Sequence, residues 1–107
     1  MTIGRRRLPQ RRASETFDLE VAGLTYIVTA SRYEDGHLGK VFITSPKLGS
    51  AADTAARDAA IVASIALQYG APVDVIRRAL CRDGSGRANG PLGAALDRLA
   101  PADGSPT

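Results

Sequence analysis

The hydrophobic pattern of this chain changes its period at Ser50, and this change decides the fold class. Before Ser50, apolar and polar residues alternate in short runs that are typical of half-buried strands. After it, the alanine-rich run from Ala51 to Tyr69 repeats its apolar residues every three to four positions, as a helix does. Ser50 is a preferred N-cap residue, and Asp53 three positions later completes a variant of the capping box. The chain is therefore expected to fold as an α+β domain.

Three strands are expected before Ser50. Residues 17–21 alternate strictly, Ala22-Gly23 favours a tight turn, and residues 24–30 are rich in β-branched and aromatic side chains. A second turn around Gly36 leads to a third strand at 38–44. Consecutive strands on short turns predict a three-stranded antiparallel β-meander that runs from about residue 15 to residue 44.

The helices are expected to pack on one face of this sheet, and there are two to three of them. Gly70 ends the first helix at 51–69, Pro72 begins a second at 72–82, and Pro91 begins a short third helix. The residues of the first helix that should face the sheet form one apolar stripe: Ala55, Ala59, Val62, Ala66 and Tyr69, widened by Ile61 and Ile65. The residues expected to face solvent form the opposite stripe: Asp53, Arg57, Ser64 and Gln68.

Charge divides the chain into an arm and a body. The net charge is +3, but the first twelve residues alone carry five arginines: Arg5, Arg6, Arg7, Arg11 and Arg12. From this charge distribution and the length of 107 residues, we expect a disordered Arg-rich arm at 1–13, one domain at 14–100 and a frayed tail at 101–107. The arm either binds nucleic acid through phosphates without reading sequence, or is only a solubilising tail.

The start of the first helix is the candidate binding site. Helix N-termini present unpaired N–H groups with a partial positive charge and favour anions, most often phosphates. Lys47 would supply a charge, Gly49 clearance for the ligand, and Ser50 a hydroxyl. The alternative is an ordinary cap, because the complete phosphate-loop pattern is absent from the sequence.

The sequence contains little that points to catalysis. One cysteine and one histidine exclude an internal disulfide and a closed structural zinc site, so no catalytic residues and no metal ligands are predicted. Cys81 is expected to be a buried or half-buried small residue, and His37 a solvated turn residue. Without an apolar run of 18 residues or a secretory signal, we expect a cytoplasmic chain that has no membrane partner.

Three phrases of the sequence, in this order and spacing, resemble one known small domain. They are residues 36–43 (GHLGKVFI), 47–50 (KLGS) and 63–72 (ASIALQYGAP). The chain resembles the C-terminal domain of adenosylcobalamin (vitamin B12)-dependent ribonucleotide reductases, the TSCPD-type domain, and in particular its stand-alone form. The Thr-Ser-Cys-Pro-Asp motif itself is absent, so its cysteine chemistry cannot be transferred. The resemblance implies that adenosylcobalamin and the catalytic cysteines belong to the family's separate catalytic domain, and no cofactor is expected in this chain.

Two functions remain open at this point. The first is a non-catalytic accessory or regulatory module, related to these reductases and to deoxyribonucleotide synthesis, that binds a nucleotide or phosphate at the Lys47–Ser50 loop. The second is a nucleic-acid-associated or assembly protein that uses its basic arm, with the body as a dimerisation unit. A three-stranded sheet leaves two edges, so a homodimer is also expected. Deleting residues 1–12 separates the two, because only the second function requires the arm.

Overall fold

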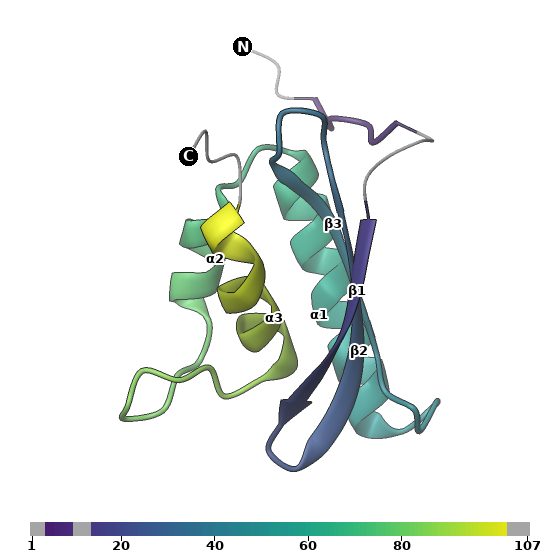
Figure 1. Ribbon diagram of the computed structural model, residues 1–107, viewed down its shortest axis with the longest axis vertical. Coiled ribbons are helices and arrows are strands. Elements are labelled where there is room, and N and C mark those ends of the chain that lie inside the picture. Colours follow the sequence, from purple (N-terminus) through teal and green to yellow (C-terminus); the bar gives the residue numbers. More distant parts are fainter. Residues whose placement is uncertain (1–3, 10–13, 103–107) are drawn as a thin grey trace.

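The computed structural model describes residues 4–9 and 14–102 and contains one three-stranded sheet followed by helices (Figure 1). The strands are β1 (Ser14–Val21), β2 (Leu24–Arg32) and β3 (Leu38–Thr44). The helices are α1 (Ala51–Gln68), α2 (Val73–Ala79), α3 (Pro91–Leu99) and a short 3₁₀ turn (Ala100–Ala102). The predicted α+β class and antiparallel meander are confirmed. Residues 1–3 and 10–13 of the predicted arm, and most of the predicted tail, lie outside the described residues.

The sheet has the order β1-β2-β3, with Phe17 opposite Val28 and Val28 opposite Ile43. Because side chains alternate along a strand, these three residues share one face, and Val28 and Ile43 are fully buried there. Both predicted turns are present. Ala22 and Gly23 have φ of 52° and 79°, as a two-residue hairpin turn requires, and Gly36 has φ of 91°.

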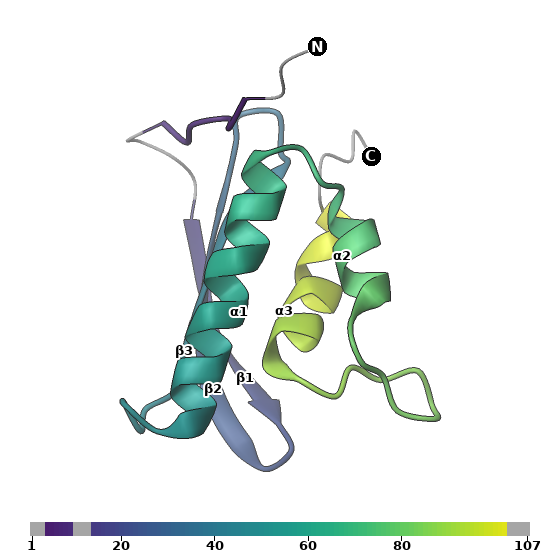
Figure 2. The ribbon, with the colours of Figure 1, turned by 180° about the vertical axis from the view of Figure 1, so that it is seen from behind.

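All three helices contribute to the core on that face of the sheet. Figures 1 and 2 show α1 running beside β3, and α2 and α3 side by side next to it. Leu92, Leu96 and Leu99 of α3 are buried, as their spacing predicts, and join the strand residues in one core. The opposite face of the sheet is more open, since Ile27 and Phe42 there are 38% and 37% exposed.

The predicted orientation of α1 about its axis is wrong. The buried residues of α1 are Asp53, Ala56, Ala60, Ala63, Ser64, Leu67 and Gln68. Val62 and Tyr69, which were expected to face the sheet, are 66% and 48% exposed. Three of the four residues assigned to the solvent stripe are instead buried.

The reason is that α1 covers the outer edge of β3, where backbone groups need partners. Val41 N donates to Ser64 Oγ at 3.0 Å, and the Ser64 hydroxyl lies 3.0 Å from Val41 O and 2.8 Å from Ala60 O. Gln68 Nε2 donates to Gly39 O at 2.9 Å. Leaving a buried backbone group unpaired costs about as much free energy as losing a hydrogen bond. These polar side chains therefore stabilise the protein more when they pair with the strand than when they face solvent.

The described part of the N-terminal arm lies against the body, next to the end of α1 (Figure 2). Arg6 N donates to Gln68 O at 2.7 Å, and the Tyr33 hydroxyl donates to Arg6 O at 2.7 Å. Leu8 and the Tyr33 ring meet at Gly39, where a Cβ would stand 2.7 Å from each. These contacts fix residues 4–9 relative to the sheet. Within the described ranges, no helix is long and apolar enough to cross a membrane.

Candidate functional site

The loop before α1 is organised around the carboxylate of Asp53. This carboxylate accepts hydrogen bonds from Ser45 N at 2.8 Å and Gly49 N at 3.1 Å, and it lies 3.2 Å from Arg57 Nε. The hydrogen bond from Ser45 N is the main reason why the pKa of Asp53 is below its ordinary value, although burial opposes the shift. The loop therefore already holds an anion, which is one of the protein's own side chains.

Each residue predicted to bind phosphate has a defined place in this loop. Ser50 is the N-cap, as predicted, because its Oγ accepts a hydrogen bond from Asp53 N at 3.1 Å. Gly49 has φ of 79° and open space around its Cβ position, while its N–H is used by Asp53. Lys47 is exposed, and its backbone N–H donates to Ser45 Oγ at 3.2 Å. Phosphate binding by these three residues stays a prediction.

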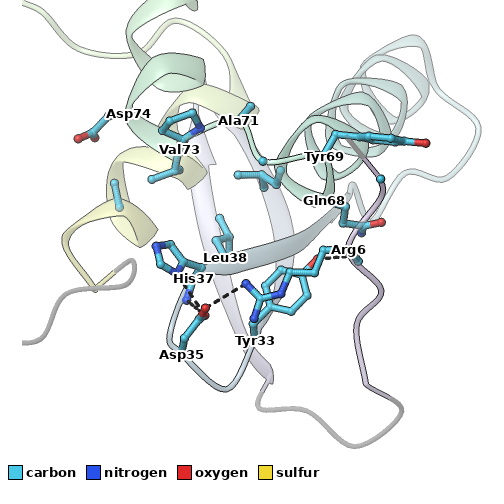
Figure 3. A pocket seen from close by; sticks show the side chains of 15 residues that line it. Arg6, Tyr33, Asp35, His37, Leu38, Gln68, Tyr69, Ala71, Val73 and Asp74 are labelled. Carbon is cyan, nitrogen blue, oxygen red and sulfur yellow. Dashed lines mark hydrogen bonds and ion pairs between the residues drawn. The ribbon is translucent and has the colours of Figure 1, made fainter. Parts of the chain in front are cut away.

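A pocket of about 460 Å³ lies between the arm, the β2–β3 turn and the C-terminal end of α1 (Figure 3). Arg6 stacks over the Tyr33 ring at 3.8 Å and its Nη1 lies 3.0 Å from Asp35 Oδ2. His37 donates its backbone N–H to Asp35 Oδ1 at 3.0 Å, and its Nδ1 is 3.1 Å from the same oxygen. The backbone hydrogen bond from His37 is the largest cause that lowers the pKa of Asp35 to about 2.

These contacts determine what the pocket offers to a ligand. Arg6, which lines this pocket among the described arm residues, is paired with Asp35, so a phosphate there would compete with that carboxylate. His37 is exposed, as predicted for a turn residue, and Asp35 is the acidic group beside it. The walls are otherwise backbone and uncharged side chains around Gly70 and Pro72, together with Asp74 at the start of α2. The pocket thus combines an exposed imidazole beside an ion-paired carboxylate with walls that are otherwise mostly uncharged.

Arg77 on α2 and Arg82 after it are paired with carboxylates of the protein, whereas Arg78 is exposed. Arg77 bonds to Asp74 at 2.7 Å and to Asp97 at 3.0 Å, and Arg82 reaches Asp97 at 2.7 and 2.8 Å. The hydrogen bond from Arg82 is the main reason why the pKa of Asp97 is lowered. This cluster ties α2 and the following segment to α3, so its structural role is sufficient to explain it.

Cys81 does not match its predicted burial, because it is exposed. It lies on an apolar groove of about 260 Å³ between α1 and α3, which is lined largely by alanine and glycine residues and by Tyr26. No group of three or more potential metal ligands occurs in the part of the chain that the structure describes.

The arginines of the arm lie in different surroundings. Arg6 lines the pocket of Figure 3, whereas Arg5 and Arg7 line a groove on the other side of the arm together with Lys40. Arg11 and Arg12 lie outside the described residues.

The chain is similar to a segment of the vitamin B12-dependent ribonucleotide reductases. It is 37% identical over 70 residues to the enzyme of Bradyrhizobium diazoefficiens, which is 65% of this chain and 6% of that protein. For Rhodopirellula baltica the identity is 39% over 72 residues, or 67% of this chain and 7% of the relative. For Streptomyces coelicolor it is 37% over 70 residues, covering 65% and 7%.

The chain thus spans less than a tenth of the length of these curated relatives. No protein-family model matches it, and no solved structure does. The sequence identities establish the similarity to a segment of the reductases. Because no family model matches, the TSCPD-type domain remains a prediction.

Proposed function

We propose that this chain is a non-catalytic accessory or regulatory module of deoxyribonucleotide synthesis that associates with a vitamin B12-dependent ribonucleotide reductase. The observation that carries the proposal is the similarity of about two thirds of the chain to one segment of those enzymes. A segment that accounts for only 6–7% of a large enzyme is more consistent with a binding or regulatory part than with its catalytic centre.

The chemistry of the 107 residues supports the non-catalytic part of the proposal. Cys81 is the one cysteine of the sequence, so the chain has no second thiol with which it could form and reform an internal disulfide during a reduction. Two clusters of charged groups at its surface, Arg6 with Asp35 and Arg77 and Arg82 with Asp97, are each paired internally. The backbone hydrogen bond from His37 and the side-chain hydrogen bond from Arg82 are the main causes that lower the pKa of Asp35 and of Asp97, respectively, which makes these carboxylates weak bases.

The regulatory ligand that we propose is a nucleotide, with a phosphate at the start of α1. Because Asp53 occupies Gly49 N–H and Ser50 Oγ is used as the cap, the groups that remain for a phosphate are the Lys47 ammonium and the backbone N–H groups of Ala51 and Ala52. ATP, dATP and inorganic phosphate titrated into ¹⁵N-labelled protein should shift the Ala51 and Ala52 amides. Lys47→Ala should weaken this binding without lowering the melting temperature; unchanged spectra in the unsubstituted protein would remove the phosphate site.

The association itself is tested with a purified B12-dependent reductase. We expect the chain to co-elute with the reductase in size-exclusion chromatography and to change its rate of deoxynucleotide formation in the presence of adenosylcobalamin. The chain alone should form no deoxynucleotide. An unrelated small protein of similar net charge serves as the control, because a basic chain binds acidic surfaces without specificity. Absence of co-elution together with an unchanged rate would refute the proposal.

A further inference from the structure

One surface of the protein combines positive charge with exposed apolar side chains, and nothing in the proposed function so far uses it. It is a groove of about 640 Å³ between the arm, β3 and α1. Its cations are Arg5, Arg7 and Lys40, and its apolar residues are Leu8, Val41, Phe42, Ile61 and Ile65. We call this surface the cationic groove.

The charge of the cationic groove is not balanced locally. No aspartate or glutamate lines it among the described residues. Arg5 Nε donates to the neutral amide oxygen of Gln68, while Arg7 and Lys40 make no ion pair with any described residue. Arg77 and Arg82, by contrast, are paired with the carboxylate of Asp97. The groove thus keeps the excess positive charge of the described arm beside the body.

The floor of the groove is apolar although it is exposed. Ile61 and Ile65 are 50% and 40% exposed, and Phe42 is 37% exposed. Ile61 and Ile65 stand one helical turn apart on α1 and so form a ridge against which another helix can pack. Large apolar side chains that gather beside charged ones are characteristic of protein interaction sites.

Electrostatics disfavours a second copy as the occupant. In a symmetric dimer the groove would meet the same groove of its partner, and since no described carboxylate lines it, Arg5, Arg7 and Lys40 would be brought near like charges without a counter-charge. The remaining segments of this chain do not fit either. Residues 1–3 have no acidic side chain, residues 10–13 carry two further arginines, and residues 103–107 contain one aspartate and no large apolar side chain.

We propose that the cationic groove binds an acidic amphipathic helix of a partner protein. Carboxylates on such a helix would pair with Arg7 and Lys40, and its apolar side chains would cover Ile61 and Ile65. A nucleic acid fits less well, because single strands use open aromatic faces for stacking, whereas the floor is largely aliphatic and Arg57 already lies over the Phe42 ring at 5.5 Å. The inference deepens the proposed function, and it rests on that function only for the assignment of the reductase as the partner.

The test uses the full chain and a fluorescein-labelled helical peptide of about 14 residues with leucines on one face and glutamates on the other. We expect saturable binding by fluorescence anisotropy. A peptide with alanine in place of leucine and an oligo-dT of equal formal charge should bind at least about ten-fold more weakly. Equal binding of the alanine peptide would overturn the proposal in favour of unspecific charge attraction. Equal binding of oligo-dT would overturn it in favour of a nucleic acid. No binding of the leucine peptide would also overturn it.

Matched substitutions locate the binding surface. Lys40→Glu and Ile65→Ser should each weaken peptide binding about ten-fold, since one places like charges together and the other removes an apolar contact. Arg78→Glu on α2 and Val62→Ser on α1 are the controls, because both residues are exposed and neither lines the groove. Circular dichroism of each variant verifies the fold. If the controls weaken binding as much as the groove variants do, the peptide binds elsewhere.

The reductase experiment separates this inference from the proposed function. If the reductase co-elutes equally well with the Lys40→Glu and Ile65→Ser variants, the groove is not its contact surface and the proposed function stands. If the peptide binds as expected and the reductase does not, the groove is correct and the partner is a different acidic protein.

Discussion

Ser64 illustrates how a single polar residue can be buried with every hydrogen-bonding group used. The residue is only 6% exposed. Its hydroxyl accepts a hydrogen bond from Val41 N and lies within 3.0 Å of the carbonyl oxygens of Val41 and Ala60. Asp53, which is 2% exposed, does the same for the loop by accepting from two backbone N–H groups. Both side chains supply hydrogen-bond partners that the backbone of β3 and of the following loop would otherwise lack.

Ser64→Ala should therefore destabilise the protein by about 1–3 kcal/mol, because Val41 N–H would remain buried without an acceptor. The measurement is the free energy of unfolding from urea titration. Thr54→Ala, an exposed position of the same helix, is the control and should change this energy by less than about 0.5 kcal/mol. Equal effects of both substitutions would mean that the edge of β3 does not depend on Ser64.

Acid should destabilise the protein through its aspartates, and Asp53 should carry part of this effect. Its pKa is lower in the folded state than the unfolded value of 3.8, so it contributes stability above that pH and loses it as the pH falls through the folded-state pKa. Asp35, Asp74, Asp83 and Asp97 have lowered pKa values as well.

We expect the difference in unfolding free energy between pH 7 and about pH 3 to be smaller in Asp53→Asn than in the unsubstituted chain. Thr54→Ala, at an exposed position of the same helix that carries no titratable group, should leave the difference unchanged. The same pH dependence in all three proteins would contradict the role assigned to Asp53.

At the scale of elements, the sequence predicts the type of each element and most limits well, but it predicts orientation poorly. The second helix is an exception among the limits, because α2 ends at Ala79 and not at residue 82. Alternation, the cap at Ser50 and the glycine that ends α1 are local signals, and each has its counterpart in the structure. The face that α1 buries is not a local property. Pattern analysis assigns polar residues to solvent, but Ser64 and Gln68 of α1 bind the exposed backbone of an edge strand, a requirement that exists only once the sheet has formed. The Ser50 cap is a local signal and predicts the position of the candidate loop. The role of Asp53 as the anion inside this loop is not a local property, because it depends on the burial of its side chain against the loop backbone.

The orientation of α1 can be tested by volume. Ala60 is fully buried, so Ala60→Leu should destabilise the protein by about 1–3 kcal/mol through overpacking. Val62→Leu on the exposed side should have an effect below about 0.5 kcal/mol. The predicted stripe through Val62 would require the larger cost at Val62, and thermal or urea unfolding decides between the two faces.

At the scale of the whole molecule, one contact joins the described part of the N-terminal arm to the sheet and to the end of α1. Residues 4–9 have the composition of a disordered arm, yet Arg6 bonds to the end of α1 and to Tyr33, and Leu8 lies over Gly39. This docking brings Arg5 and Arg7 beside Lys40 and so creates the cationic groove. Composition does not reveal such a contact. The contact requires Gly39 of β3, which is distant from the arm in sequence and leaves room for the side chains of Leu8 and Tyr33.

Gly39→Ala should release the arm while the body remains folded, because the added methyl group would stand 2.7 Å from both Leu8 and the Tyr33 ring. Trypsin should then cleave after Arg6 roughly five-fold faster, since a loss of about 1 kcal/mol in docking raises the undocked population by that factor. Gly84→Ala is the control, because a Cβ at that loop position meets nothing within 4 Å. The Gly39→Ala variant should also bind the acidic peptide more weakly, as the groove loses Arg5 and Arg7 together. Unchanged cleavage after Arg6 with a folded body would show that the arm does not need Gly39 for docking.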